Sequence, residues 1–312
     1  MFEIIRYTAD RADEWNAFVA RSKNGTFLFD RGYMDYHADR FEDFSLMFYL
    51  DGRLYGLLPA NRKGDVLQSH MGLTYGGLVM DAKMTATATV ELFRQMNIYL
   101  REQGIRQVLY KCIPWIYHQL PAEEDLYAIF RTCDARLVAR DISTTIVQAK
   151  AMRWERVRRR GVKRAADNGL RVEKSMDYAA FWPVLNDNLG HKYSARPVHT
   201  VDEMMLLHGR FPENIVLYNA LKDDAVVGGI VVYVTPQVVH AQYSSATPEG
   251  KKWGAIDAIY DRIINHDYRH YAYFDFGKST EDRGAYLNDE LIFQKEGFGG
   301  RGVCYDWYEW TL

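Results

Sequence analysis

The sequence predicts an α/β fold built from two similar units in tandem, each a mixed, mostly antiparallel sheet flanked by helices. Apolar stretches typical of strands alternate with segments of helical periodicity along the 312 residues. The order of these stretches in the first half recurs in the second half at an offset of about 170 residues. A strongly basic segment begins where the repeat restarts, which places the units at residues 1–150 and 151–312.

The first unit opens with a predicted strand at 2–7, followed by helices at 12–22 and 31–40. Two apolar runs joined by Asp51-Gly52 then predict a hairpin, since this dipeptide between strand-like runs favours a tight turn. The segment 65–80 adds one or two strands. A helix at 84–103 and a strand at 107–113 complete the unit.

The second unit replays this order. Its hairpin, within 214–236, turns at Asp223-Asp224, and the segment 237–250 matches 65–77, with Tyr243 near the position of Tyr75. A helix is expected at 255–266 and a returning strand at 271–276. This regular recurrence predicts a tandem duplication of one α/β unit.

Bulk composition is that of an ordinary globular protein. Apolar residues make up 48%, charged residues 26%, and the net charge of −2 gives no global attraction to nucleic acid or membrane. Cys112, Cys133 and Cys304 lie far apart, which argues against a disulfide framework and fits a reducing cytoplasm. His266 and His270 have a metal-friendly spacing but no evident third ligand, so no metal site is expected.

Neither end of the sequence suggests export or a membrane span. The opening "MFEIIRYTADRADEW" carries acidic residues and only a short apolar run, unlike a signal peptide. No uninterrupted apolar run reaches the ~18 residues of a membrane-spanning helix. We therefore expect a cytoplasmic protein.

The stretch "YFDFGKST" contains fragments of two phosphate motifs. Asp275-Phe276-Gly277 spells the metal-binding triplet of protein kinases, but no His-Arg-Asp occurs in the chain. Gly277-Lys278 spells the end of a P-loop, but the position that requires glycine is Ala272. The glycine pattern at 297–302 lacks the strand before and helix after that a dinucleotide site needs, and no G-x-S-x-G elbow is present.

The segment "MRWERVRRRGVKRAADNGL" holds seven basic residues between positions 153 and 164, against one acid. On a helix most of them share one face, and Asn168-Gly169 is a good helix stop. Two interpretations stay open: a solvated face beside a domain junction, or a phosphate-binding face. The residues of this face are Arg153, Arg156, Arg160, Lys163 and Arg164.

The C-terminal unit resembles the acetyltransferase superfamily known as GNAT, and the whole chain resembles the FemAB-type aminoacyl/acyltransferases, which carry two such units in tandem. The resemblance rests on the basic segment, on "YFDFG", and on "GAYLNDELIFQKEGFGGR". Two places depart from the pattern. Phe293 stands where simple GNAT enzymes often have a tyrosine, and "TPEGKKWGA" keeps Gly250 and Gly254 without the usual spacing of the pyrophosphate loop.

This resemblance implies acyl transfer, which needs a neutral amine, donors for the oxyanion and a protonated leaving group. Lys295 is the first candidate for the stabilising cation and Lys278 the second. Asp275 would hold a substrate ammonium or orient Lys278, and Tyr243 or Tyr286 would supply the phenol that Phe293 lacks. Structural alternatives stay open for each: a helix-end lysine, a turn-capping aspartate, packed tyrosines.

Further candidates come from polar segments. The segment 190–200 is expected to be a long polar loop after a helix, of the kind that closes over substrates. The predicted substrate-binding residues are Lys192, Tyr193, Arg196 and Tyr286, with Arg31, His70 and Tyr75 from the first unit. The predicted phosphate-binding residues are Arg156, Arg160, Lys163, Arg164, Gly250 and Gly254, the glycines because helix N-terminal amides hold anions.

Three functions follow as hypotheses. The first is an acyl- or aminoacyltransferase acting on an amine of a cell-envelope or polysaccharide precursor. It would bind no cofactor tightly but use aminoacyl-tRNA or acyl-CoA as co-substrate. Its expected partners are a small-molecule, lipid-linked or nucleotide-linked sugar acceptor and a tRNA acceptor end, with peripheral membrane association through a lipid-linked substrate. The second is an acyl-CoA-dependent GNAT N-acetyltransferase, and the third a catalytically inactive binding protein of the same fold.

Overall fold

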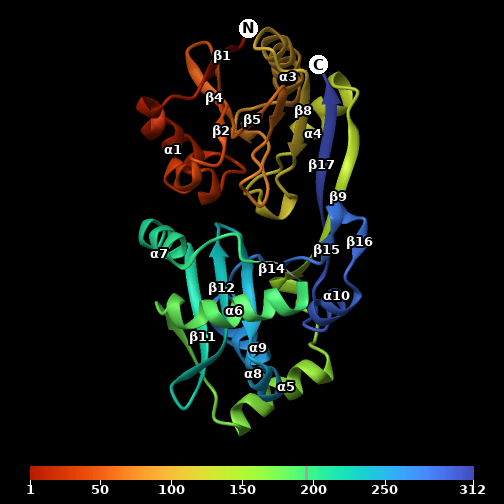
Figure 1. The fold of residues 1–312 in the computed structure, drawn as a ribbon. Coiled ribbons are helices and arrows are strands. Elements are labelled where there is room, and N and C mark those ends of the chain that lie inside the picture. Colours follow the sequence, from red (N-terminus) through yellow and green to blue (C-terminus); the bar gives the residue numbers. More distant parts are fainter. Residues whose placement is uncertain (194–195) are drawn as a thin grey trace. The chain divides into compact units, whose positions relative to one another are not determined.

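A computed structural model describes residues 1–193 and 196–312, with the side chains of 191–193 outside the description. The chain forms two compact units (Figure 1). Unit 1 comprises Met1–Ile142, Thr280–Tyr286 and Cys304–Leu312, and unit 2 comprises Ser143–Ser279 and Leu287–Val303. This division differs from a simple boundary after residue 150, because two late segments group with unit 1.

Unit 1 contains two groups of paired strands. One has the order β1-β3-β4-β7, and in the other β9, β17, β8, β6, β5 and β2 follow one another. Its apolar core is formed by side chains of these strands and of α3 and α4. The elements are β1 (Glu3–Arg6), α1 (Ala12–Arg21), α2 (Arg31–Met34), β2 (Glu42–Asp43), β3 (Leu46–Leu50), β4 (Arg53–Leu58), β5 (Asn61–Lys63), β6 (Val66–Gln68), β7 (Val79–Met80), α3 (Ala86–Glu102), β8 (Gln107–Lys111), α4 (Glu124–Thr132), and parts of β9 (Arg136–Val147), β16 (Tyr286–Leu287) and β17 (Arg301–Thr311), with the short β15 (Thr280–Glu281).

The predicted hairpin at Asp51-Gly52 is confirmed. The two residues have φ of 51° and 73° between β3 and β4, as the tight turns of two-residue hairpins require. The predicted helix at 31–40 is wrong beyond its first turns. α2 ends at Met34 and a 3₁₀ turn, Asp35–His37, follows. Residues 38–40 are exposed, so they have no core to pack against, and a short helix without packing is not stable.

Unit 2 is built on an open sheet in which the strands follow the order β10-β11-β12-β13-β14-β9. The turn between β11 and β12 confirms the predicted hairpin, since Asp223 and Asp224 both have positive φ (48° and 63°). The elements are α5 (Arg156–Asp167), β10 (Arg171–Ser175), α6 (Tyr178–Tyr193), α7 (Val201–Arg210), β11 (Ile215–Lys222), β12 (Ala225–Val234), β13 (Val238–Ala246), α8 (Pro248–Trp253), α9 (Ala255–Tyr260), the π-helical turn Asp261–Asp267, β14 (Tyr273–Lys278) and α10 (Asp289–Glu296).

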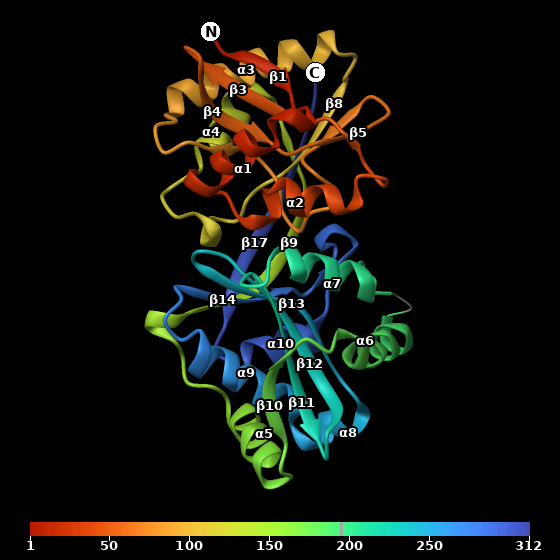
Figure 2. The same cartoon turned by 90° about the vertical axis from the view of Figure 1, so that its left-hand side faces the viewer.

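Helices cover both faces of the unit 2 sheet (Figure 2). Neighbouring glycines of β12 mark the two faces: a Cβ on Gly229 would lie 2.4 Å from Phe181 of α6, and one on Gly228 would lie 3.3 Å from Ala255 of α9. Side chains alternate along a strand, so odd and even positions of β12 face different helices. The face toward α9 carries one large apolar cluster of unit 2.

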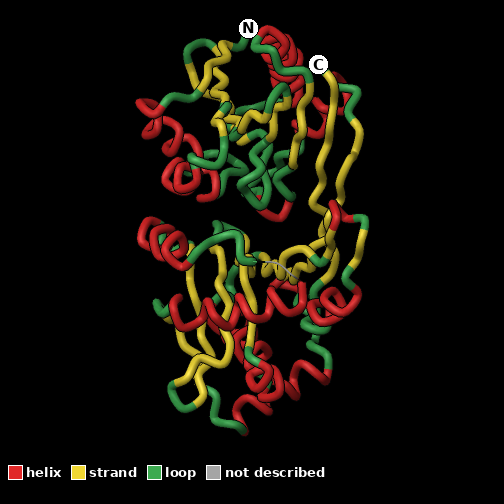
Figure 3. The backbone as a smooth tube through the Cα atoms, viewed as in Figure 1, coloured by secondary structure: helices red, strands yellow, loops and turns green. Residues whose placement is uncertain are grey.

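Each unit contains a pair of parallel strands that are connected through a helix. Figure 3 colours the helices red and the strands yellow. In unit 1 β6 pairs with β8 (Val66↔Gln107), and in unit 2 β13 pairs with β14 (Val238↔Tyr273). The offsets, 238 − 66 = 172 and 273 − 107 = 166, agree with the predicted repeat. The predicted fold class is therefore confirmed. No helix within the described residues is long and apolar enough to cross a membrane.

Candidate active site

The candidate site lies where β13 and β14 stop pairing. These parallel strands are in register at only three positions, and His240↔Asp275 is the last. A register shift against β12 inserts one extra residue, Gln242, into β13 just beyond that point. Gly277, with φ of 75°, then turns the end of β14. The carboxyl end of a parallel strand is where α/β sheets bind ligands.

Asp275 is fully buried and accepts three hydrogen bonds. Its Oδ1 accepts from Ser143 Oγ (2.5 Å) and Thr145 Oγ1 (2.8 Å), and its Oδ2 contacts His240 Nδ1 at 2.7 Å. Burial alone would raise the pKa of this carboxyl, but the hydrogen bonds and the charge of His240 outweigh it and lower the pKa. The side chain is therefore an ionised acceptor in a dry setting.

His240 takes its orientation from this carboxylate. Because an ionised Asp275 can only accept, His240 Nδ1 is the protonated donor in this contact, and Nε2 is the other ring nitrogen. The imidazole is buried, and a Cβ on Gly277 would lie 3.2 Å from its Cε1. Reasoning from the sequence missed this residue. Within "QVVHAQY" it is typical of a strand position, and only the register of β13 against β14 gives it a partner.

Lys295 reaches the same strand end from α10. Its Nζ donates to the carbonyl oxygens of Gly277 and Lys278, both at 2.8 Å. Burial lowers the pKa of this ammonium to about 8, although the charge of Asp275 acts in the opposite direction. Two of its three N–H donors are thus engaged. No acceptor for the third occurs among the residues that the structure describes.

Tyr243 forms a second polar pair further along β13. Its hydroxyl lies 2.6 Å from His199 Nδ1, and Trp182 packs against its ring edge-on. Burial raises the pKa of the phenol to about 12, so it stays protonated at neutral pH. Two buried oxygens close to this end of the sheet in sequence, Gln242 Oε1 and Ser279 Oγ, have no hydrogen-bond partner within the described part of the chain. Such atoms are costly unless a ligand or water satisfies them.

The other predicted site residues in the second half of the chain do not take part in these contacts. The side chains of Lys278, Arg196 and Tyr286 are exposed. Lys192 and Tyr193 have side chains outside the described residues. The expected loop at 190–200 is wrong in its first part, because α6 continues to Tyr193.

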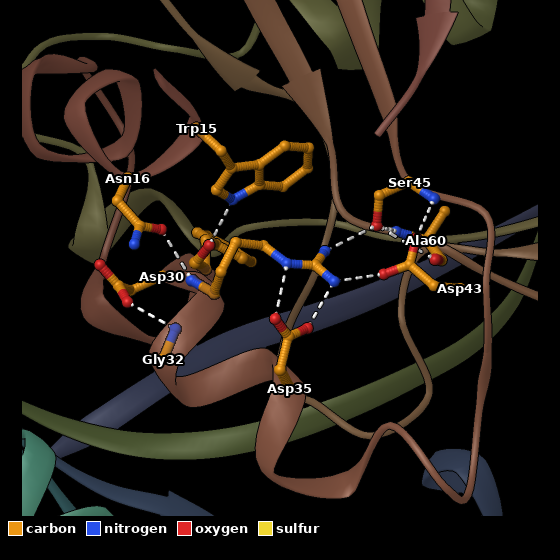
Figure 4. Close-up of polar contacts among 10 residues, drawn as sticks. Trp15, Asn16, Asp30, Gly32, Asp35, Asp43, Ser45 and Ala60 are labelled. Atoms are coloured by element: carbon orange, nitrogen blue, oxygen red, sulfur yellow. Dashed lines mark hydrogen bonds and ion pairs between the residues drawn. The ribbon is translucent and has the colours of Figure 1, made fainter. Parts of the chain in front are cut away.

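The three substrate-binding candidates of unit 1 are buried there. Arg31 forms ion pairs with Asp35 (2.5 Å) and Asp43 (2.6 Å), drawn as dashed lines in Figure 4. Its guanidinium also lies over the ring of Tyr7. Burial lowers the pKa of His70 to about 3, so it is neutral. Tyr75 donates its hydroxyl to Thr26 Oγ1 at 3.0 Å. The burial and the contacts of these three residues within unit 1 account for their presence, so they are not part of the proposed site.

The predicted phosphate-binding residues fall into two groups. Arg156, Arg160, Lys163 and Arg164 are exposed on α5, as expected from helical spacing. The two glycines have packing reasons instead. A Cβ on Gly250 would lie 2.0 Å from the carbonyl oxygen of Val227, and the Gly250 amide N–H already donates to Thr247 Oγ1 rather than to an anion. A Cβ on Gly254 would lie 2.3 Å from the carbonyl oxygen of Gly161.

No cluster of three or more histidine, cysteine, aspartate or glutamate side chains suited to a metal ion occurs within residues 1–193 and 196–312. The polar groups at the end of β14 are an oriented imidazole and a buried ammonium, which are side chains of the kinds used in acid–base chemistry.

Comparison with known proteins agrees with this fold. Residues 151–286 match the family model of the acetyltransferase (GNAT) domain. A search of the curated proteins finds no match.

Solved structures of similar fold cover nearly the whole chain. FemX has a TM-score of 0.70 at 10% identity, covering 99% of this chain and 97% of that one. The C-terminal domain of a putative lysylphosphatidylglycerol synthetase from Agrobacterium fabrum has a TM-score of 0.62 at 14% identity, covering 96% and 91%. A tandem GNAT protein from the clavulanic acid pathway has a TM-score of 0.56 at 11% identity, covering 100% and 98%. At these identities the similarity shows the fold.

Proposed function

We propose that the protein transfers an acyl or aminoacyl group to an amine and that unit 2 carries the chemistry. The observation that supports this most is the buried Asp275–His240 pair at the point where β13 and β14 part, with Lys295 bound to the same strand end. The GNAT domain match, which lies largely in this unit, supports the reaction class.

His240 is the proposed general base. An amine substrate is protonated at neutral pH and must lose a proton before or during its attack on the acyl carbonyl. The Nε2 nitrogen of His240 accepts that proton, and the ionised Asp275 then stabilises the imidazolium without taking the proton itself. The attacking nitrogen forms the new C–N bond as the bond from the carbonyl carbon to the donor's sulfur or oxygen breaks.

Lys295 and Tyr243 are proposed to stabilise the negative charge that develops on the oxyanion and on the leaving atom. Lys295, with a pKa of about 8, is mostly protonated at pH 7, and its third N–H is proposed to donate to the oxyanion of the tetrahedral intermediate. Tyr243 stays protonated and is a candidate donor to the leaving atom. Phe293 cannot do this, because it has no hydroxyl and its ring is 63% exposed.

The donor is proposed to be an aminoacyl-tRNA or an acyl-CoA, and the acceptor an amine of an envelope or polysaccharide precursor. The structural similarity to FemX and to a lysylphosphatidylglycerol synthetase domain favours aminoacyl transfer, and the GNAT domain match favours acyl-CoA. Because Gly250 and Gly254 are explained by packing, neither glycine supplies an argument for CoA. Asp275 is proposed to orient His240, and Lys278 takes part only through its carbonyl oxygen, which accepts from Lys295 Nζ.

Donor binding tests the proposal. We expect one donor class, acyl-CoAs or a non-hydrolysable aminoacyl-tRNA analogue, to raise the melting temperature of the full chain, because a ligand that binds only the folded state stabilises it. Mass spectrometry of reactions with that donor and amine acceptors should then show a new amide. Lack of stabilisation by either class at concentrations up to about 1 mM would overturn the proposal.

A catalytically inactive binding protein is the second candidate. It is favoured by the two carbonyl groups that Lys295 already binds, since a lysine held in this way also has a structural role. This candidate predicts donor stabilisation without amide formation, so the same experiment separates the two.

A further inference from the structure

The outer face of α5 carries a dense group of positive charges. Exposed on it are Arg156, Arg159, Arg160, Lys163 and Arg164. The acid on this face, Asp167, pairs with Lys163 at 2.7 Å. No ion pair with Arg156 or Arg160 occurs among the described residues, so their charges are not neutralised within the chain.

The opposite face of α5 fixes the direction in which these cations point. Gly161 packs so closely on α9 that a Cβ there would lie 1.9 Å from Asp257 Oδ2. Arg158 forms an ion pair with Asp257 at 2.9 Å, and Ala165 is 1% exposed. These contacts leave no freedom for the helix to rotate its cations toward the core.

Apolar side chains flank the cations. Val157, on α5 itself, is 46% exposed, and Met152, just before the helix, is 48% exposed. The exposed Phe293 is close to the start of α5 through two hydrogen bonds: Gly297 N donates to the Phe293 carbonyl oxygen (3.0 Å), and Glu155 N donates to the Gly297 carbonyl oxygen (2.8 Å). Apolar side chains beside a cationic helix face are the combination found on surfaces that lie in a membrane interface.

We propose that this surface, the outer face of α5 with Met152 and Phe293, docks on an anionic lipid bilayer. The cations from Arg156 to Arg164 form a line of charge about 12 Å long, which suits a flat surface better than a single phosphate. Anionic headgroups attract the cations, and the interface takes up aliphatic and aromatic side chains. A single-stranded nucleic acid would instead need aromatic rings interleaved with the cations, and α5 contains none.

This inference deepens the proposed function, on which it rests for one point only: a lipid-linked acceptor would be met at the membrane. In this proposal, the phosphates that the sequence predicted to bind this face are those of lipid headgroups. The test measures vesicle binding, which needs neither an acyl donor nor a transfer reaction. The docking proposal can therefore fail while the proposed reaction holds, and the reverse.

Co-sedimentation of the full chain with vesicles tests the proposal. We expect binding to phosphatidylcholine vesicles that contain about one-third phosphatidylglycerol, none to phosphatidylcholine alone, and weakening as salt rises. Neutralising Arg156, Arg160 and Arg164 to Gln should lower the partition coefficient on the order of a hundredfold, since each cation contributes about a factor of five. The matched control neutralises three exposed cations of unit 1 and should change it less than about fivefold. The control residues are Lys63, Lys83 and Arg101.

Val157→Ser separates a bilayer from other polyanions. It leaves every charge in place and should lower vesicle binding severalfold, while binding to a tRNA, if present, should not change. Equal losses in the two triple variants would show that only net charge matters and would overturn the proposal. So would absence of binding to the anionic vesicles, or tRNA binding through the α5 arginines without vesicle binding.

Discussion

Replacing Lys295 by Met tests the buried ammonium at the end of β14 through the pH dependence of stability. Burial lowers its pKa from 10.5 to about 8. At about 1.4 kcal/mol per pH unit, the 2.5 units between these values correspond to roughly 3 kcal/mol by which folding disfavours the charged form. Against this, the variant loses two hydrogen bonds to carbonyl oxygens, at about 1 kcal/mol each.

The cost of the buried charge depends on pH, whereas the loss of the two hydrogen bonds is taken as constant. Below about pH 8 the lysine is protonated in both states, and the folded protein bears the full cost of the buried charge. Between about pH 8 and 10.5 the folded state has released this proton while the unfolded state retains it, so stability rises with pH. By pH 9.5 the wild type should regain about 2 kcal/mol relative to the Lys295→Met variant.

Urea unfolding followed by tryptophan fluorescence, at pH 7 and pH 9.5, measures this difference. Comparing wild type with variant cancels the other titrating groups. We expect the variant to be about 1 kcal/mol more stable at pH 7 and the wild type to be about 1 kcal/mol more stable at pH 9.5. The exposed Lys252→Met variant is the control and should track the wild type at both values. If the Lys295→Met difference were the same at both pH values, the buried-charge reasoning would be refuted.

Two further predictions concern backbone strain and a buried ion pair. Gly277→Ala should cost about 1–2 kcal/mol in unfolding free energy, because φ is 75° and the new Cβ meets His240, whereas Gly209→Ala, in open space on α7, should be neutral or stabilising. Arg31→Met should cost about 2 kcal/mol, because the buried guanidinium loses both ion pairs while Asp35 and Asp43, 43% and 34% exposed, stay partly hydrated. Arg94→Met, whose ion pair with Glu91 is exposed on both sides, should cost under about 1 kcal/mol, and equal losses in these two variants would contradict the burial argument.

The sequence was sufficient to predict elements whose causes are local. Asp51-Gly52 and Asp223-Asp224 predicted both hairpins, because these residues tolerate the positive φ that the turns need. The cationic face of α5 was predictable for a similar reason, since helical spacing alone places its arginines together.

What could not be predicted depends on contacts between distant residues. His240 and Asp275 are 35 positions apart and meet only through the register of β13 and β14. Arg31 and His70 occur in segments rich in polar residues, yet the fold buries both side chains. Sequence composition gives no measure of burial for a polar residue whose partners come from other strands.

The single-turnover rate of transfer by a His240→Asn variant, with the donor that stabilises the protein, tests the central claim most directly. Asparagine Nδ2 takes the place of His240 Nδ1 as the donor to Asp275, so the buried carboxylate keeps its partner and only the basic Nε2 is lost. The exposed His266→Asn variant is the control. We predict a loss of about 10²- to 10⁴-fold in rate with unchanged donor affinity. A rate within about twofold of the wild type would contradict a general base at His240.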